Sequence, residues 1–260
     1  MPDRGNMNPP LIEIVGVVGL PEIENGAELG SMIVMAALGQ DTSLENGDIL
    51  VVTQKVISKA EGRTIDLRTV IPSERGLKLA IETGRDPRMV ELILRESKSI
   101  VRIDSTRGII ITETHHGFIC ANAGIDQSNV EGEHLVSLLP EDPDNSARRI
   151  CEEVAQVTGK RVAVIISDTF GRAWREGQVN FAIGVSGLDP ILDYRGSLDK
   201  QGSVLKTTSI AVADELVGAG EMVMGKAEGI PVALIRGYRY QPSVGGVAGL
   251  LRDPSTDLFR

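Results

Sequence analysis

The sequence predicts an α/β protein built on a mixed β-sheet. Apolar segments at residues 11–20, 162–167 and 230–237 have the composition of buried strands, and segments with helical periodicity lie between them. Residues 99–125 instead alternate β-branched and polar side chains around glycine-containing turns, which is typical of antiparallel hairpins. Hydrophobic residues make up 42% of the chain but aromatic residues only 3%, so we expect an aliphatic core of the kind found in sheets covered by helices.

The other elements are predicted in order along the chain. The polar, proline-containing residues 1–10 are expected to form a mobile arm, and residues 11–260 a single domain, for which a division into two interlocked lobes is the alternative. The tail from residue 238 onward is expected to lie over the surface of that domain. Periodicity predicts helices at residues 26–38, 73–83, 86–97, 146–159 and 207–224, a turn and strand at 46–58, and a strand at 179–188.

Capping residues support three of these helices. Ser73 and Asp86 are expected to cap two helices at their N-termini, and Pro87 suits the first helical position of the second. Ser146 is the candidate cap of the next helix, which Gly159 should end. These signals are local, so they predict boundaries independently of how the elements pack.

Composition excludes several classes of partner. The formal net charge is −9, which disfavours nucleic acid because a polyanion needs a basic surface. We expect neither a signal peptide nor a membrane span, since no apolar run is long enough for either. The two cysteines, Cys120 and Cys151, lack metal-binding spacing and predict a reduced, cytoplasmic setting.

One glycine-rich stretch resembles a phosphate-binding loop. Residues from Gly220 to Lys226 match the pattern Gly-x-x-x-x-Gly-Lys, but Ala227 replaces the serine or threonine that follows it. A phosphate-binding loop also runs from a strand into a helix, whereas this stretch ends a predicted helix and leads into a strand. We therefore interpret it as a helix C-terminus with glycine caps.

The segment ISDTFGRAWREG contains the most informative polar residues. Asp168 and Thr169 are expected at the end of an apolar strand, where carboxylate and hydroxyl oxygens suit Mg²⁺ or Mn²⁺. Arg172 and Arg175 follow in a loop and have the geometry to bind phosphate or carboxylate. A capping Asp-Thr turn with surface arginines is the alternative, and spacing alone leaves both open.

Two further segments add weaker signals. Asp126 and Asn129 follow a predicted strand and offer oxygen ligands, although the same spacing occurs in ordinary turns. Lys55, Lys59 and Arg63 form a basic set, for which the alternative is a solvated surface. No Gly-x-Ser-x-Gly or His-Glu-x-x-His motif is present, so acyl-enzyme hydrolysis and zinc proteolysis gain little support.

Four blocks of the sequence, in this order, resemble the coenzyme F420-0:L-glutamate ligase family. The likeness covers about Leu11 to Arg236, and the ending DLFR looks like the bacterial branch of the family. Some bacterial relatives carry a nitroreductase-like domain after this module, and this chain ends before one. The blocks are VVTQKVISKAEGR, NAGIDQSNV, ISDTFGRAWREGQVNFAIGVSGL and VADELVGAGEMVMGKAEGIPVALIRG.

The resemblance implies an activity and a fold. It implies GTP-dependent attachment of L-glutamate to F420-0, followed by γ-linked extension, through an acyl-phosphate intermediate. It implies Mg²⁺ or Mn²⁺ as cofactor, K⁺ as a further candidate, and an unusual α/β fold that forms an intertwined homodimer. Two alternatives stay open: a ligase for another carboxylate acceptor or amino acid, and a non-catalytic nucleotide-binding dimer.

The resemblance also implies roles for individual residues. Asp126, Asp168 and Thr169 are implied as metal ligands. Asp168 together with Arg172 and Arg175 of the following loop is the candidate catalytic set. The implied nucleotide contacts are Leu20, Pro21, Glu22, Ile23, Gln54, Lys55, Lys59, Asn129, Met224, Gly225, Lys226, Ala227, Glu228, Gly229 and Ile230.

Lys226 departs from the family pattern. Relatives carry Glu or Gln after Met-Gly, where the side chain helps to hold metal, and a lysine ammonium cannot ligate a metal ion. Three interpretations follow: Glu228 substitutes, the site has fewer protein ligands, or Lys226 contacts phosphate.

Overall fold

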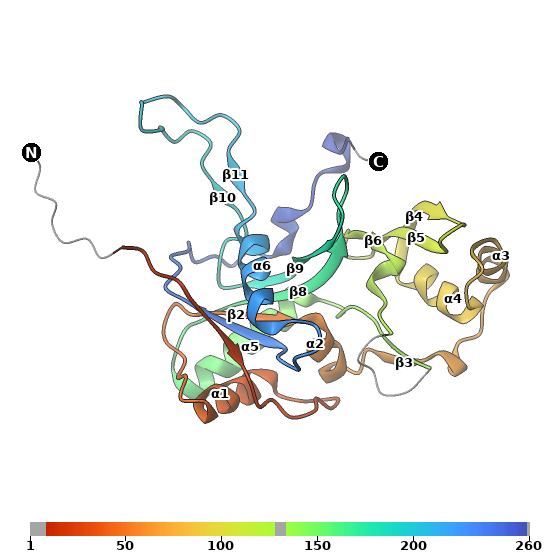
Figure 1. The fold of residues 1–260 in the computed structure, drawn as a ribbon, viewed down its shortest axis with the longest axis horizontal. Helices are drawn as coiled ribbons and strands as arrows, with labels where there is room; N and C mark the ends of the chain where they lie inside the picture. Colours follow the sequence, from red (N-terminus) through yellow and green to blue (C-terminus); the bar gives the residue numbers. More distant parts are fainter. Residues whose placement is uncertain (1–8, 128–133, 259–260) are drawn as a thin grey trace, which may run out of the picture.

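A mixed five-stranded sheet organises the molecule, as predicted (Figure 1). The computed structural model describes residues 9–127 and 134–258. The strand order is β1-β12-β2-β8-β9, with β2 and β8 parallel and every other neighbouring pair antiparallel. The strands are β1 (Glu13–Val17), β2 (Ile49–Thr53), β8 (Ala163–Gly171), β9 (Gln178–Ser186) and β12 (Val232–Arg236).

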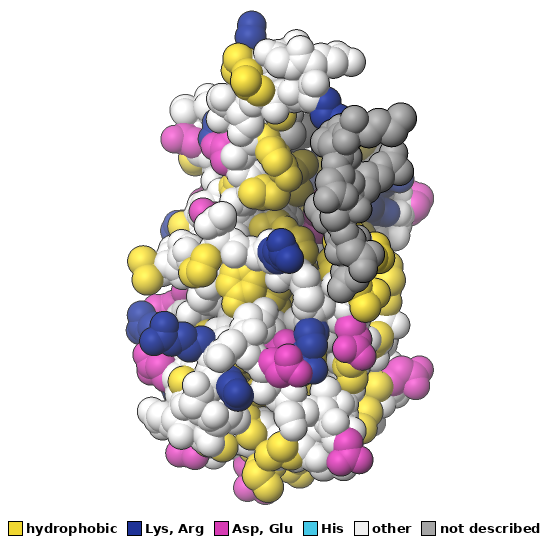
Figure 2. Space-filling view, turned by 90° about the vertical axis from the view of Figure 1, so that its left-hand side faces the viewer, with side chains coloured by type: hydrophobic (Ala, Val, Ile, Leu, Met, Phe, Trp, Pro, Cys, Tyr) yellow, Lys and Arg dark blue, Asp and Glu magenta, His cyan; other side chains and the backbone are white. Residues whose placement is uncertain are grey.

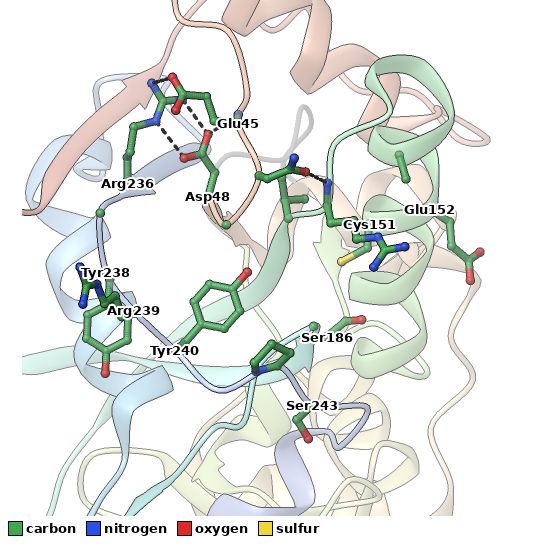
Figure 3. A pocket seen from close by; sticks show the side chains of 18 of the residues that line it. Glu45, Asp48, Cys151, Glu152, Ser186, Arg236, Tyr238, Arg239, Tyr240 and Ser243 are labelled. Atoms are coloured by element: carbon green, nitrogen blue, oxygen red, sulfur yellow. Dashed lines mark hydrogen bonds and ion pairs between the residues drawn. The ribbon is translucent and has the colours of Figure 1, made fainter.

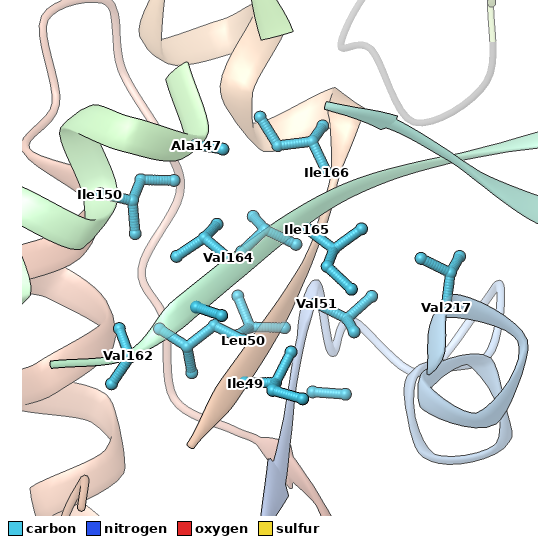
Figure 4. Packing of buried hydrophobic residues seen from close by; sticks show 14 of the residues in the cluster. Ile49, Leu50, Val51, Ala147, Ile150, Val162, Val164, Ile165, Ile166 and Val217 are labelled. Carbon is cyan, nitrogen blue, oxygen red and sulfur yellow. The ribbon is translucent and has the colours of Figure 1, made fainter. Parts of the chain in front are cut away.

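Helices cover both faces of this sheet. Helix α5 (Pro143–Thr158) packs on β8 and β9 with α1 (Leu29–Gly39) beside it, and α6 (Val212–Met224) packs against β9, β12 and β1. Figure 4 shows Ile150 of α5 and Val217 of α6 on opposite sides of the strands. Because both faces are buried, the central strands are continuous aliphatic runs and not alternating ones.

A close approach of α5 to β9 depends on Gly184. A Cβ atom at this position would lie 2.5 Å from the backbone carbonyl of Pro143. We expect Gly184→Ala to lower the free energy of unfolding by about 3 kcal/mol, because α5 would have to move away from the sheet. Chemical denaturation measures this.

Gly218→Ala is the matched control. Gly218 lies within α6, and a Cβ atom added there would have no neighbouring atom within 4 Å, so the same change should raise stability by about 0.5–1 kcal/mol. Equal effects at Gly184 and Gly218 would contradict the packing argument.

A second hydrophobic cluster lies beside the main core, in the right-hand part of Figure 1. It joins two helices to a small meander, and the predicted caps are confirmed: Ser73 Oγ accepts from the Gly76 amide, and Asp86 accepts from Arg88 with Pro87 in the first turn. The division into two lobes stays a prediction. The elements here are η1 (Leu67–Thr69), α3 (Glu74–Thr83), α4 (Pro87–Arg95), β4 (Ser97–Asp104), β5 (Ile109–Thr114), β6 (Ile119–Ala121) and η2 (Asn122–Gly124).

Short elements connect and extend these cores. Strands β3 (Thr64–Asp66) and β7 (Leu135–Ser137) pair with each other, and Ile65 and Val136 pack in the second cluster. Strands β10 (Leu192–Asp193) and β11 (Ser209–Ile210) form the base of a hairpin that projects from the body (Figure 1). Figure 2 faces the side of this projection and shows hydrophobic side chains exposed on it.

The tail packs on the body, as predicted. Tyr240, Leu250 and Leu251 contact the main core, and the tail contains η3 (Val247–Leu250) and η4 (Pro254–Thr256). Among the residues described, no helix combines the length and apolarity needed to cross a membrane.

Three predicted boundaries were wrong. Helix α5 begins at Pro143 with Asp142 as its cap, so Ser146 lies inside the helix, where its hydroxyl donates to the Asp142 carbonyl. The strand predicted at 46–58 ends at Thr53 and gives way to helix α2 (Gln54–Ala60). The helix predicted from residue 207 begins at Val212, because Ser209 and Ile210 pair in the projecting hairpin.

The predicted end of the strand at residues 162–167 was also wrong. Strand β8 continues to Gly171 because it forms a hairpin with β9, in which Asp168 lies opposite Phe181 and Thr169 opposite Asn180. The expected arginine-rich loop, residues 172–177, connects the two strands of that hairpin.

Candidate active site

A pocket of about 310 Å³ lies where β2 ends beside β8. Pairing between the two strands stops at Thr53 and Ser167, while β8 continues along β9. The early end of β2 therefore opens one side of β8 at Asp168 and Thr169. The predicted residues that line this pocket are Leu20, Pro21, Glu22, Ile23, Gln54, Lys55, Lys59, Asp168, Thr169, Gly225, Lys226, Ala227, Gly229 and Ile230.

Two lysines of α2 line the same side of the pocket. Lys55 and Lys59 are four residues apart on this helix, so their side chains share one face. Lys55 Nζ lies 2.9 Å from Asp126 Oδ2, and Lys59 forms an ion pair with Glu22. These two lysines of the predicted basic set therefore lie on a helix, and not at the end of a strand.

The carboxyl of Asp168, which lines the pocket, has a raised pKa. The pKa of this carboxyl is raised to about 7, mainly by burial and to a smaller extent by Asp126, while the Thr169 backbone amide, Lys226 and Lys55 oppose the shift. A half-buried carboxyl of this kind gains stability when a cation neutralises it.

The shift predicts a pH-dependent stability difference. Since the folded-state pKa lies above the unfolded value, the Asp168 contribution to stability is present at low pH and lost as pH rises from about 4 to about 7. In metal-free protein, Asp168→Asn should therefore gain stability relative to the unsubstituted chain across that window. Denaturation of both proteins at a series of pH values measures the difference, and a pH-independent difference would contradict the shift.

A hydrogen-bonded chain runs through the pocket wall. Lys226 Nζ donates to Thr169 Oγ1, which donates to Asn180 Oδ1 at 2.5 Å, and Asn180 Nδ2 donates to Glu221 Oε2 at 2.5 Å. Asn180 and Glu221 also line the pocket, and the sequence reasoning missed them. A usable signal for Glu221 was its place on the apolar stripe of α6, between Val217 and Met224.

Other predicted residues lie elsewhere. Asp126 forms a bridge with Ser137 and contacts the pocket through Lys55. Met224 is fully buried in the core, and Glu228 is exposed beside Gly225. Asn129 lies outside the described residues.

Arg172 and Arg175 do not line the pocket. Both are exposed in the turn of the β8–β9 hairpin, where Arg172 Nη2 donates to the carbonyl of Glu176 at 3.1 Å. Their catalytic role stays a prediction.

The glycine-rich stretch ends a helix, as predicted. Helix α6 stops at Met224, and Gly225, at φ +60°, donates its amide to the carbonyl of Glu221. The chain then runs into β12. This context differs from a phosphate-binding loop, yet it brings Gly225 and Lys226 to the pocket.

The donor set fits one divalent ion shared with a ligand. The described ranges contain no group of three or more His, Cys, Asp or Glu side chains able to hold a metal by themselves. Asp126 and Asp168 interact electrostatically, and magnesium sites of proteins often combine one or two carboxylates with substrate phosphates. The pocket therefore suits a metal that arrives with a phosphorylated ligand.

A larger, open cavity of about 1620 Å³ lies at the other end of β2 (Figure 3). Its buried carboxylate, Asp48, is already paired with Arg236 at 2.7 Å, and Glu45 lies 3.0 Å from the same guanidinium. Burial raises the pKa of the Cys151 thiol to about 11, so it is not a thiolate nucleophile. The predicted site residues line the smaller pocket and not this one.

Comparison with known proteins shows the family. The model of the family described as F420-0:Gamma-glutamyl ligase matches residues 17–237. A coenzyme F420:L-glutamate ligase of Methanothermobacter thermautotrophicus is 47% identical over 96% of this chain and 99% of its own length. Enzymes of the same name from Methanocaldococcus jannaschii and Methanopyrus kandleri are 44% and 43% identical, covering 96% and 92% of this chain and 97% and 94% of their own lengths.

The class of protein is thus a ligase. The chain belongs to the F420-0:gamma-glutamyl ligase family.

Proposed function

We propose that the protein joins L-glutamate to coenzyme F420-0 in a GTP-dependent reaction and then extends the product through γ-linked glutamates. Family membership supports the acceptor and the amino acid, since close relatives carry the name coenzyme F420:L-glutamate ligase. The single structural observation that supports a phosphate-activated reaction is one pocket that combines lysines with a partly buried carboxylate. GDP and phosphate are the other expected products.

An acyl phosphate explains why a nucleotide is needed. Hydroxide is a poor leaving group from a carboxylate, whereas phosphate is a good one. Transfer of the GTP γ-phosphate to the acceptor carboxylate forms the acyl phosphate, and the glutamate amine then displaces phosphate to form the amide. The developing negative charge is stabilised by nearby cations.

Residues of the pocket can be given roles in this reaction. Lys55 and Lys59 are placed to bind phosphate oxygens from the face of α2, and the turn from Leu20 to Ile23 forms the adjacent wall. Asp126 and Asp168 would hold Mg²⁺ or Mn²⁺, which would supply charge neutralisation at the phosphates. K⁺ stays a prediction without a site.

Oxygen transfer tests the intermediate. When F420-0 carries heavy oxygen in its acceptor carboxylate, one heavy oxygen should appear in the phosphate released during glutamate addition. Mass spectrometry of the phosphate measures it. GDP formation with unlabelled phosphate would exclude the acyl-phosphate route.

The two alternative functions predict different results. A ligase for another acceptor would release GDP with that acceptor but not with F420-0. A non-catalytic dimer would bind GTP, measured by calorimetry, without releasing phosphate under any combination of metal and acceptor.

We also propose a homodimer. The projecting hairpin exposes Leu198 at 65% and Val204 at 53%, and apolar side chains on an extended arm suit contact with a second subunit. Light scattering of the purified protein measures its mass directly, and a monomer at all concentrations would contradict the proposal.

A further inference from the structure

The wall of the pocket contains a hydrogen-bonded chain built from neighbouring elements. Thr169 of β8 and Asn180 of β9 are cross-strand partners, and Glu221 lies on α6, which packs against β9. Lys226 follows the end of α6 and reaches Thr169 from the other side. The sheet register and the helix packing therefore place all four side chains together.

The donors and acceptors allow one direction only. An ammonium has only protons to donate and a carboxylate only accepts, so the two ends of the chain are fixed by Lys226 and Glu221. Asn180 must then present its nitrogen to Glu221 and its oxygen to Thr169. Thr169 donates its single hydroxyl proton to Asn180, so the lone pairs of the Thr169 oxygen face Lys226.

This arrangement has a consequence for cation binding. A hydroxyl with its proton directed away is a good ligand for a cation, and here the cation is the ammonium of Lys226. Asn180 is 7% exposed, so solvent does not readily compete for the orientation of Thr169. Lys226 also acts electrostatically on the neighbouring Asp168.

We propose that Asn180 and Glu221 are positioning residues that hold the Lys226 ammonium against the Thr169 hydroxyl. The ammonium then occupies the Thr169 oxygen, which would otherwise contact a metal ion. The inference rests on the proposed metal site but not on the acceptor or on turnover. A divalent ion is then held by Asp126 and Asp168 with the phosphates, without Thr169. Of the three interpretations of Lys226 given above, the proposal supports the second, in which the metal site has fewer protein ligands.

Manganese binding tests the proposal without any reaction. Free Mn²⁺ is measured by electron paramagnetic resonance during titration of the nucleotide-free protein at constant pH. Lys226→Met should bind Mn²⁺ about tenfold more tightly, because it removes a positive charge and frees the Thr169 oxygen. Lys226→Arg, which keeps the charge and the donors, should stay close to the unsubstituted protein.

Lys59→Met is the matched control, because Lys59 lines the same pocket but pairs with Glu22. It should change Mn²⁺ affinity less than Lys226→Met does. Equal or weaker Mn²⁺ binding by Lys226→Met would overturn the proposal. Absence of binding by both proteins would overturn it together with the metal site, whereas absence of glutamate ligation alone would leave it standing.

A double-mutant cycle tests the positioning role. Asn180→Ala should tighten Mn²⁺ binding severalfold in the unsubstituted chain, since Thr169 is then free to turn away from Lys226. In the Lys226→Met background the same change should weaken Mn²⁺ binding instead, because Asn180 then directs the Thr169 lone pairs toward the metal ion. Additive effects in the two backgrounds would show that Asn180 does not act through Lys226, and melting curves report whether each variant is folded.

Discussion

Asp168→Asn should lower turnover by about a thousandfold or more while leaving the fold intact. Asp168 is the partly buried carboxyl that faces the pocket, and burial raises its pKa. The amide keeps the shape of the side chain but removes the charge that a metal and the lysines require. Initial rates of GDP release, measured with circular dichroism as a check of folding, give the result.

Asp41→Asn is the control for this prediction. Asp41 is exposed and has a positive φ of 59°, a conformation that asparagine adopts readily. This variant should keep the rate of the unsubstituted protein. Residual activity above a tenth in Asp168→Asn would show that the carboxylate is not part of the reacting centre.

Lys55→Met should lower kcat/KM for GTP by about a hundredfold. Lys55 connects the pocket to Asp126, and its loss removes a proposed phosphate contact and the ion pair of that carboxylate. Steady-state kinetics with GTP as the varied substrate measure the effect.

Lys78→Met removes a lysine that pairs with Glu74 on the exposed face of α3, and it should leave the kinetics unchanged. An Mn²⁺ affinity unchanged in Lys55→Met, together with an unchanged KM for GTP, would argue that Lys55 has a structural role only.

Local signals in the sequence predicted much of the fold. The strands at the centre of the sheet are continuous aliphatic runs, and Ser73, Asp86 and Gly159 cap or end helices through contacts within a few residues. Such elements are determined by their own composition and periodicity, so they can be identified without knowledge of the packing. The mixed sheet was predicted from the combination of helices with hairpins at residues 99–125, but those hairpins form a separate three-stranded sheet, and the antiparallel pairs of the main sheet involve β1, β12 and β9.

Long-range contacts explain what the sequence did not predict. Strand β8 extends past Asp168 because β9 pairs with it, and Val212 begins α6 because the preceding residues pair in the hairpin. Asn180 and Glu221 look like isolated polar residues in a strand and a helix, and only their meeting in three dimensions gives them a role.

Resemblance to a family contributed more to the site than spacing did. From spacing alone, Asp168 and the two hairpin arginines could belong either to a binding site or to a capped turn. The structure brings Asp168 into the pocket but not Arg172 or Arg175. The lysines of α2 were assigned to the end of a strand, and their helical spacing explains why both face the pocket. Side chains four residues apart share a face on a helix, and a strand was wrongly predicted for this segment.

Glutamate addition to F420-0 tests the central claim most directly. The purified protein is incubated with F420-0, GTP, L-glutamate and Mn²⁺ or Mg²⁺, and the mass of the deazaflavin product is measured by mass spectrometry. The proposed function predicts a product heavier by one glutamyl residue, formed together with GDP and absent when GTP is omitted or Asp168→Asn is used. F420-0 of unchanged mass under all metal conditions would contradict it.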